Sequence, residues 1–177
     1  GYRISRGVSH HEKALRAAIG SGINLIDTST NYADGGSEAL VGQVLQDLTD
    51  TGEVQRNQII VISKVGYLQG ENFTLSQQRK SEGRPFQNLV EVGEGLEHCI
   101  HPDFIEDQLS RSLTRLKLET LDGYLLHNPE YYLGWALKSG LPLEKARSEY
   151  YRRIRAAFGY LEKEVAKGRI RFYGISS

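Results

Sequence analysis

Apolar residues are distributed along the chain in two alternating patterns. Short apolar runs, the clearest at residues 23–26 and 59–62, predict buried strands. Longer segments in which apolar residues recur every three or four positions predict amphipathic helices. Strand and helix alternate, which predicts parallel strands joined by helices. We expect strands over residues 2–5, 23–26, 59–62, 121–126 and 171–174, and helices that begin near Ser9, Ser37, Pro102 and Glu144.

A polar loop joins the second predicted strand to the second predicted helix. Gly35 and Gly36 in this loop are typical of a turn. Ser37 is expected to be the N-cap of the helix, with Glu38 in its first turn, and Ser9 has the same N-cap role in the first helix. A glycine pair also occurs in phosphate-binding loops, but a turn before a helix explains it more simply.

Two segments show little regular pattern. Residues 65–100 mix Gly, Gln, Glu and Asn, and a loop of this length inside a compact domain is usually functional or mobile. Residues 128–142 form a second insertion that carries Tyr131, Tyr132 and Trp135. These three aromatic side chains are candidates for the apolar wall of a substrate pocket. Packing of the insertion on its own aromatic residues is an equally good explanation.

The length suits one domain, so we interpret residues 1–177 as a single α/β domain with a long insertion at about 65–100. A doubly wound sheet would normally show G-x-G-x-x-G after its first strand, and the opening G-Y-R-I-S-R-G-V-S lacks it. A (β/α)8 TIM barrel takes about 250 residues, and this chain would hold roughly its strands 1 to 5. The absence of methionine and a last strand that stops in its own loop also suggest a fragment.

Composition excludes several classes of partner. Basic and acidic residues number 22 each, so we expect no nucleic-acid partner. No apolar run reaches the roughly 20 residues that span a bilayer, so we expect no membrane partner. The single cysteine, Cys99, fits a reducing cytoplasm. His98 and His101 flank it and His10 and His11 are adjacent, but without a third ligand at good spacing we expect no metal.

Four polar residues lie at or just beyond the ends of three predicted strands, namely Asp27, Tyr32, Lys64 and His127. Singly, each has an ordinary explanation as a loop cap, a packing tyrosine, a solvated lysine or a structural histidine. The carboxyl ends of parallel strands lie on one face, however, and ligands bind there in parallel α/β folds. We therefore expect the four side chains to meet in one pocket.

This set of side chains suits the delivery of a proton to an oxygen that gains negative charge. A tyrosine hydroxyl, with a reference pKa of about 10, is a weak acid near neutrality unless a cation stabilises the phenolate. Lys64 would be that cation, and Asp27 would be its counter-charge. His127 can donate a hydrogen bond that polarises a carbonyl. The site suits carbonyl reduction, with a hydride from a nicotinamide and a proton from Tyr32.

Four motifs follow one another in the chain: D-T-S-T-N-Y-A-D-G-G-S-E-x-x-V-G at 27–42, I-S-K at 62–64, L-L-H-N at 125–128 and Y-G-I-S-S at 173–177. In this order and spacing, the chain resembles the aldo-keto reductase superfamily over nearly its whole length, residues 65–100 excluded. The resemblance implies a (β/α)8 barrel that reduces aldehydes or ketones with NADPH, a small-molecule carbonyl being its partner. It leaves the oligomeric state open.

The resemblance also implies roles for single residues. Asp27, Tyr32, Lys64 and His127 match the catalytic tetrad of that family. Asp27 also borders the cofactor site, and Ser176 and Ser177 fall where the family offers polar contacts to the nicotinamide carboxamide, commonly Ser then Asn. Ser177 departs from that pattern. The alternative is a regulatory or partner-binding subunit that keeps the barrel without catalysis, although an intact tetrad favours the enzyme.

Overall fold

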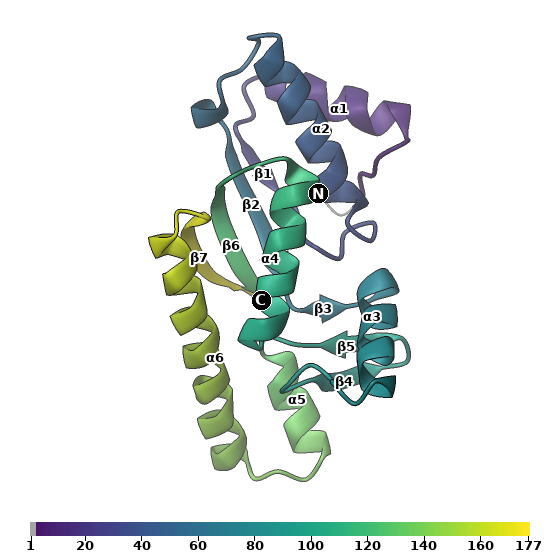
Figure 1. The fold of residues 1–177 in the computed structure, drawn as a ribbon, viewed down its shortest axis with the longest axis vertical. Coiled ribbons are helices and arrows are strands. Elements are labelled where there is room, and N and C mark those ends of the chain that lie inside the picture. Colours follow the sequence, from purple (N-terminus) through teal and green to yellow (C-terminus); the bar gives the residue numbers. More distant parts are fainter. Residues whose placement is uncertain (1–2) are drawn as a thin grey trace.

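The computed structural model describes residues 3–177 and is built around one parallel sheet (Figure 1). Its strands follow the order β1-β2-β6-β7, and every neighbouring pair is parallel. The register places Asp27 beside Ile62 and His127 beside Ser176, so the carboxyl ends of the strands form a common edge. The strands are β1 (Leu25–Asp27), β2 (Ile60–Val65), β6 (Leu121–His127) and β7 (Ile170–Ser176).

Helices pack on one face of this sheet. Alternate strand residues such as Val61, Ser63 and Tyr124 are fully buried against them, because successive strand side chains point to opposite faces. On the other face, Leu25 and Phe172 remain exposed. The four helices that alternate with the parallel strands or precede them are α1 (Ser9–Gly20), α2 (Gly36–Asp50), α4 (Pro102–Leu116) and α6 (Leu143–Ala166), with a 3-10 turn, η1 (Arg56–Gln58), before β2.

The predicted strands after residue 20 and the four predicted helices are confirmed, but the strand expected over residues 2–5 is not. Residue 2 lies outside the described part of the chain, and Arg3 to Ser5 form a loop. Backbone groups of this loop are bonded elsewhere: Ser5 N–H donates to His11 Nδ1 at 3.1 Å, and Arg6 N–H donates to Gly36 O at 3.3 Å. These contacts take the place of a strand ladder.

Both predicted serine N-caps are also wrong, because the N-cap residue lies one position before Ser9 and two positions before Ser37. Helix α1 begins at Ser9 itself, with Val8 at its N-cap. Helix α2 begins at Gly36, after Gly35 in the left-handed conformation with φ of 83°. Ser37 is buried inside the first turn, where its hydroxyl lies 2.9 Å from that of Thr28. Its polar group ties α2 to the end of β1 instead of capping the helix.

The insertion at 65–100 is folded, which corrects the expectation of a segment with little regular structure. It forms an antiparallel sheet of order β3-β5-β4 with one helix packed against it (Figure 1). The strands are two to four residues long, too short to give a visible alternation of apolar and polar positions. The elements are β3 (Tyr67–Leu68), α3 (Gly70–Ser81), β4 (Val90–Gly93) and β5 (Leu96–His98).

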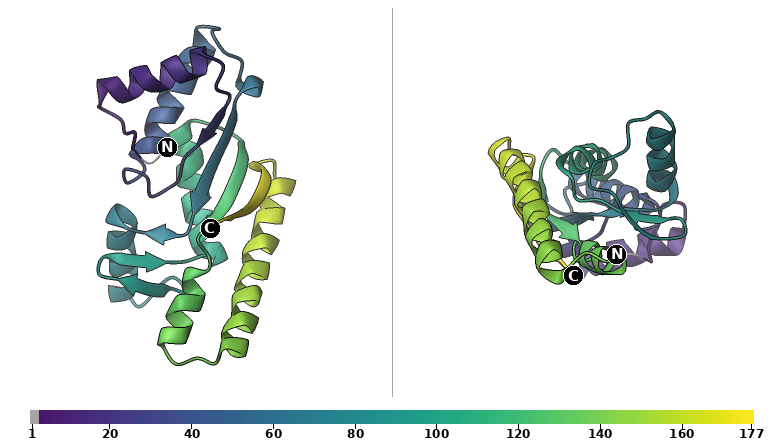
Figure 2. Two further views of the ribbon diagram at one scale, coloured as in Figure 1. Left: turned by 180° about the vertical axis from the view of Figure 1, so that it is seen from behind. Right: turned by 90° about the horizontal axis from the view of Figure 1, so that it is seen from below.

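The second insertion contains one helix, α5 (Tyr131–Lys138), which lies between the first insertion and helix α6. It packs against β4 and against α6, beside which it runs in the view from behind (Figure 2, left). Val90, Tyr132, Ala136 and Ala146 form a small core between these elements, separate from the main core. Among the described residues, no helix combines the length and the hydropathy needed to cross a bilayer.

Candidate active site

Lys64 is buried at the end of β2, with only 4% of the residue exposed. Its ammonium group donates to Asp27 Oδ1 at 2.6 Å and to the backbone carbonyl of Thr28 at 2.9 Å. The carboxylate of Asp27 is itself about half exposed, since it closes the outermost strand of the sheet. A charged lysine in a buried position needs such partners, and the structure supplies both a counter-charge and a carbonyl.

Tyr32 reaches the same ammonium group from the loop after β1. Three consecutive residues, Ala33, Asp34 and Gly35, have positive φ angles of 50°, 52° and 83°, which turn the chain sharply into α2. The turn holds the phenol hydroxyl 3.5 Å from Lys64 Nζ, and Nζ lies 5.0 Å from the centre of the ring. The ammonium group of Lys64 therefore lies close to both the Tyr32 phenol and its counter-charge, Asp27.

His127 closes β6 and stands across from Tyr32, with the two ring centres 5.9 Å apart and nearly perpendicular. Burial lowers the pKa of His127 to about 4, and the positive charge of Lys64 acts in the same direction. The imidazole is thus neutral near pH 7 and carries a single N–H. Its Nδ1 atom lies 3.2 Å from Ser29 Oγ, a contact that leaves Nε2 available to a ligand.

The folded insertion at 65–100 contacts the backbone of His127 through a hydrogen bond from His98. His98 Nε2 lies 2.7 Å from the backbone carbonyl of His127 and must donate to it, since a carbonyl only accepts. Burial lowers the pKa of His98 to about 4, so this ring is neutral as well. Gly66 passes between them: a Cβ at this position would stand 2.5 Å from His127 O and 2.6 Å from His98 Nε2. Only glycine fits there.

Tyr67 follows Gly66, and its ring packs against the ring of His127. Its ring centre is 4.7 Å from that of His127 and 5.5 Å from that of Tyr131, in both cases edge to face. The Tyr67 hydroxyl donates to Asn128 Oδ1 at 2.9 Å. Burial raises the pKa of Tyr67 well above its usual value, so this phenol stays protonated. It offers an aromatic surface with its hydroxyl already bonded.

These side chains surround an open cavity of about 550 Å³. Its volume is within the range of small-molecule sites. Tyr32 and His127 both line this cavity, and aromatic side chains from both insertions line it beside them. Its lining residues are Asn31, Tyr32, Ala33, Tyr67, Gln69, Leu96, His127 and Tyr131.

The structure separates the three aromatic residues expected to line a substrate pocket. Tyr131 lines the cavity. Tyr132 is buried in the small core, where the Arg153 guanidinium lies 3.9 Å from its ring centre. Trp135 packs beside that core and lines a different hollow of about 260 Å³. Tyr131 alone of the three lies with Tyr32 and His127.

The two serines expected to contact a cofactor lie at the end of β7. Ser176 is half-buried next to His127 in the sheet, and its backbone carbonyl accepts a hydrogen bond of 2.7 Å from Asn128 N–H. Ser177 is exposed just beyond the strand. Sequence reasoning missed Ser29 and Tyr67, and considered His98 only as a metal ligand. Ser29 lies inside the first motif and could have been found there, whereas the other two needed the fold of the insertion.

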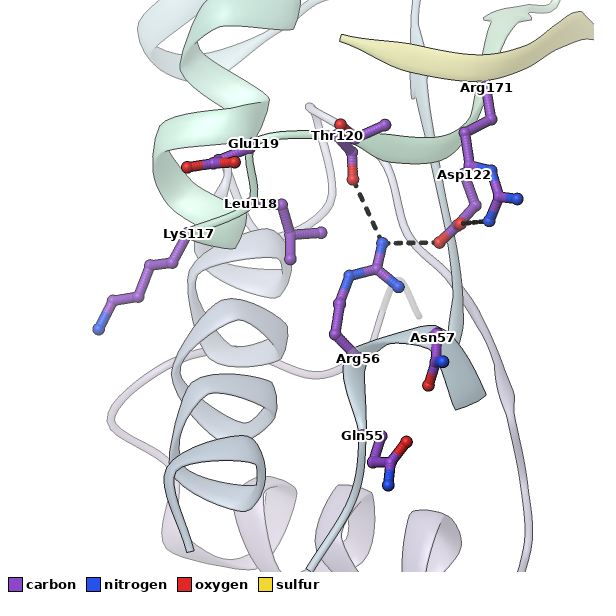
Figure 3. A pocket seen from close by; sticks show the side chains of 9 residues that line it. All are labelled: Gln55, Arg56, Asn57, Lys117, Leu118, Glu119, Thr120, Asp122 and Arg171. Carbon is purple, nitrogen blue, oxygen red and sulfur yellow. Dashed lines mark hydrogen bonds and ion pairs between the residues drawn. The ribbon is translucent and has the colours of Figure 1, made fainter. Parts of the chain in front are cut away.

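The opposite ends of the strands hold a larger hollow of about 800 Å³, lined by charged side chains (Figure 3). Asp122 accepts hydrogen bonds from Arg56 at 2.7 Å, Arg171 at 3.2 Å and the Val61 backbone N–H. Burial opposes its ionisation, but these donors outweigh burial and hold the pKa of Asp122 below its usual value. The amino-terminal face of a barrel contributes stability, so we assign this cluster a structural role.

Fold and site together define a class of protein. A parallel sheet wrapped by helices on one face, with acid-base side chains at the carboxyl ends of its strands, is the arrangement of (β/α)8 barrel enzymes. The described structure is a partial barrel of this kind. Among its residues, no group of three or more His, Cys, Asp or Glu side chains could hold a metal ion.

Comparison with known proteins identifies the family. A family model described as Aldo/keto reductase family matches residues 8–177, and the chain belongs to this family. It is 31% identical over 164 residues to the methylglyoxal reductase YeaE of Escherichia coli, with 93% of this chain and 38% of that protein covered. It is also 31% identical over 106 residues to the NADH-specific methylglyoxal reductase of the same organism, covering 60% of this chain and 27% of that protein.

Solved structures agree on the fold. The aldo-keto reductase AKR11C1 from Bacillus halodurans matches with a TM-score of 0.61 and 22% identity, covering 96% of this chain and 41% of its own. An aldo/keto reductase from Klebsiella pneumoniae, in complex with NADP and acetate, matches with a TM-score of 0.52 and 25% identity, covering 94% and 38%. The chain thus spans about two fifths of the length of these relatives.

Proposed function

We propose that this protein reduces an aldehyde or ketone to an alcohol with a nicotinamide cofactor, and that Tyr32 delivers the proton. The observation that carries the proposal is the position of Lys64 Nζ, 2.6 Å from Asp27 Oδ1 and 3.5 Å from the Tyr32 hydroxyl. A buried cation beside a phenol at the edge of a cavity suits the transfer of a proton to a developing alkoxide.

The residues at the strand ends fit a nicotinamide nucleotide. The half-exposed carboxylate of Asp27 and the half-buried Ser176 offer an acceptor and a hydroxyl, which suit the hydroxyl and carboxamide groups of such a cofactor. We propose that Asp27, Ser176 and Ser177 contact it. When bound, the cofactor supplies hydride to the carbonyl carbon.

The protein residues then act on the carbonyl oxygen. His127 donates a hydrogen bond from its neutral ring and fixes that oxygen near the Tyr32 hydroxyl. As negative charge develops on the oxygen, Tyr32 gives up its proton, and the ammonium group of Lys64 stabilises the phenolate. Asp27 orients Lys64 through their ion pair. The aromatic rings of Tyr67 and Tyr131 exclude water from one side of the cavity.

We propose NADPH as the preferred cofactor and small aldehydes as substrates. Solved relatives from Klebsiella pneumoniae are described in complex with NADP or NADPH, which supports the first choice. One Escherichia coli relative is described as NADH-specific, so NADH is the competing outcome. Two relatives are named as methylglyoxal reductases, which makes methylglyoxal the first aldehyde to test. A cavity of about 550 Å³ is large enough for such a compound.

The test is cofactor oxidation by the full-length protein with methylglyoxal and a panel of simple aldehydes, using NADPH and NADH in parallel. Turnover that depends on both aldehyde and cofactor supports the proposal, and the ratio of kcat/KM values for the two cofactors decides between them. Cofactor binding measured by nicotinamide fluorescence, without turnover on any aldehyde, would contradict it. That result favours the regulatory subunit, in which binding rather than chemistry is the function.

A further inference from the structure

A line of polar side chains leads from the surface to the imidazole of His127. Ser29 Oγ lies 3.2 Å from His127 Nδ1 and donates to Asn31 Oδ1 at 2.7 Å. Asn31 Nδ2 in turn donates to Gln69 Oε1 at 3.1 Å. Ser29 is fully buried, Asn31 is half-buried and Gln69 is exposed. The line therefore runs from the folded insertion to the inner side of the cavity.

The protonation site of His127 depends on this line. A neutral imidazole carries its proton on one nitrogen only, so Nε2 can donate to a substrate oxygen only when Nδ1 is an acceptor. Nδ1 faces the Ser29 hydroxyl, which has a single hydrogen. If that hydrogen goes to Asn31, or to the Lys64 backbone carbonyl 3.4 Å away, Nδ1 must keep its own proton and Nε2 becomes an acceptor. If it goes to Nδ1, Nε2 is a donor.

The two amides can reverse the direction of these hydrogen bonds while the donor–acceptor distances stay the same. A half-turn of each side-chain amide exchanges its oxygen and nitrogen. Asn31 then donates to Ser29 Oγ, and the Ser29 hydroxyl donates to His127 Nδ1. The hydrogen bonds keep their heavy-atom distances of 3.1, 2.7 and 3.2 Å, and Nε2 receives the proton. Amides are suited to this role because each offers both a donor and an acceptor.

We propose that Ser29, Asn31 and Gln69 are positioning residues that place the proton of neutral His127 on Nε2, facing the carbonyl oxygen. Asn31 donates a hydrogen bond to Ser29 Oγ, and the Ser29 hydroxyl can then donate its hydrogen to His127 Nδ1. The effect on rate rests on the proposed reductase function. The choice of Nε2 also follows from that function, which needs a donor facing the carbonyl oxygen, but the protonated nitrogen is measured separately in the protein without substrate.

Asn31→Asp is the decisive variant. A carboxylate can only accept, so it takes the Ser29 hydrogen and forces the proton of His127 onto Nδ1. Ser29→Ala removes the contact and adds no charge. Asn57→Asp is the matched control, since it makes the same chemical change at an exposed position beside the hollow at the opposite ends of the strands (Figure 3).

The measurement is ¹⁵N NMR of the full-length protein labelled at histidine, with the His127 signals assigned by their loss in His127→Gln. We expect Nε2 protonated in the wild type and in Asn57→Asp, Nδ1 protonated in Asn31→Asp, and loss of the strong preference in Ser29→Ala. The same tautomer in the wild type and Asn31→Asp, or Nδ1 protonated in the wild type, would overturn the inference.

Kinetics give the second arm. Asn31→Asp should lower kcat for an aldehyde by about 100-fold, as the loss of one oxyanion donor does in other enzymes, and change KM less. A changed tautomer with unchanged kcat would overturn the assigned effect on the carbonyl. If the wild type turns over no aldehyde, the proposed function fails, while the NMR result still decides the tautomer.

Discussion

Lys64 Nζ donates to Asp27 Oδ1 across a distance of 2.6 Å, and the two side chains differ greatly in exposure: that of Lys64 is 5% exposed and that of Asp27 is 45%. The cation is thus the buried member of the pair and depends on its counter-charge more than the carboxylate does. Removing one partner of such a pair leaves an uncompensated charge in a poorly solvated position.

This relationship predicts the result of Asp27→Asn. The variant keeps the shape of the side chain but removes the charge, so Lys64 is less well held beside the Tyr32 hydroxyl. We expect kcat for aldehyde reduction to fall by about 100-fold or more, in the range of a lost general-acid contribution. Asp47→Asn makes the same change on helix α2, where Asp47 pairs with Arg16 at 2.6 Å, and should retain kcat within about threefold. Equal losses in both variants would contradict a specific role for Asp27.

A side chain at position 66 is expected to displace the backbone of His127. In Gly66→Ala, the new Cβ would stand 2.5 Å from the His127 carbonyl and 2.6 Å from His98 Nε2, so the strand and the insertion must move apart. Overpacking of this kind costs about 1–3 kcal/mol of folding free energy, which denaturant titration can measure. Gly93→Ala is the control, because a Cβ there meets no atom within 4 Å. A Gly66→Ala variant as stable as Gly93→Ala would argue against the close approach.

The buried position of His98 is expected to make the folded chain less stable in acid. Its pKa is lowered by burial to about 4 in the folded chain, against a reference value of 6.5, so the unfolded chain binds a proton in this interval and the folded chain does not. Stability from His98 is therefore complete above pH 6.5 and lost as the pH falls toward 4, by about 3 kcal/mol at most.

Replacement of His98 tests this directly. His98→Gln retains a donor for the His127 carbonyl but does not titrate, so the unfolding free energy should fall less steeply between pH 6.5 and 4 than in the wild type. His127, with its pKa also lowered to about 4, continues to contribute, so part of the dependence should remain. An unchanged pH dependence would mean that His98 does not titrate differently in the two states.

The sequence predicted the parallel strands after residue 20 because short, largely apolar segments such as residues 59–62 alternate with helical segments and are followed by polar residues. It placed Asp27, Tyr32, Lys64 and His127 on one edge for the same reason, and their distances agree with that placement. The assignment of their roles remains a prediction. The topology of a parallel sheet, more than any local propensity, is what brings residues a hundred positions apart together.

The insertion was not predictable from the same patterns. Its strands are short, and its buried polar residues act through partners far along the chain. Glu97, for example, is buried and accepts from Ser76 and Lys80 on α3, which no local pattern reveals. Glu38 is another case: it occupies the first turn of α2 as expected, but it is fully buried and pairs with Arg115 at 2.6 Å. Burial of a charged residue depends on its distant partner.

The central claim is that Tyr32 supplies the proton, and the most direct measurement is the rate of a single turnover with saturating NADPH and an aldehyde in Tyr32→Phe and Tyr67→Phe. Both phenols line the cavity, but the Tyr67 hydroxyl donates to Asn128, whereas the Tyr32 hydroxyl lies 3.5 Å from Lys64 Nζ. We expect cofactor binding in both variants, a loss of rate of at least about 1,000-fold in Tyr32→Phe, and less than about tenfold in Tyr67→Phe. A Tyr32→Phe variant that reduces the aldehyde at the wild-type rate would contradict the account.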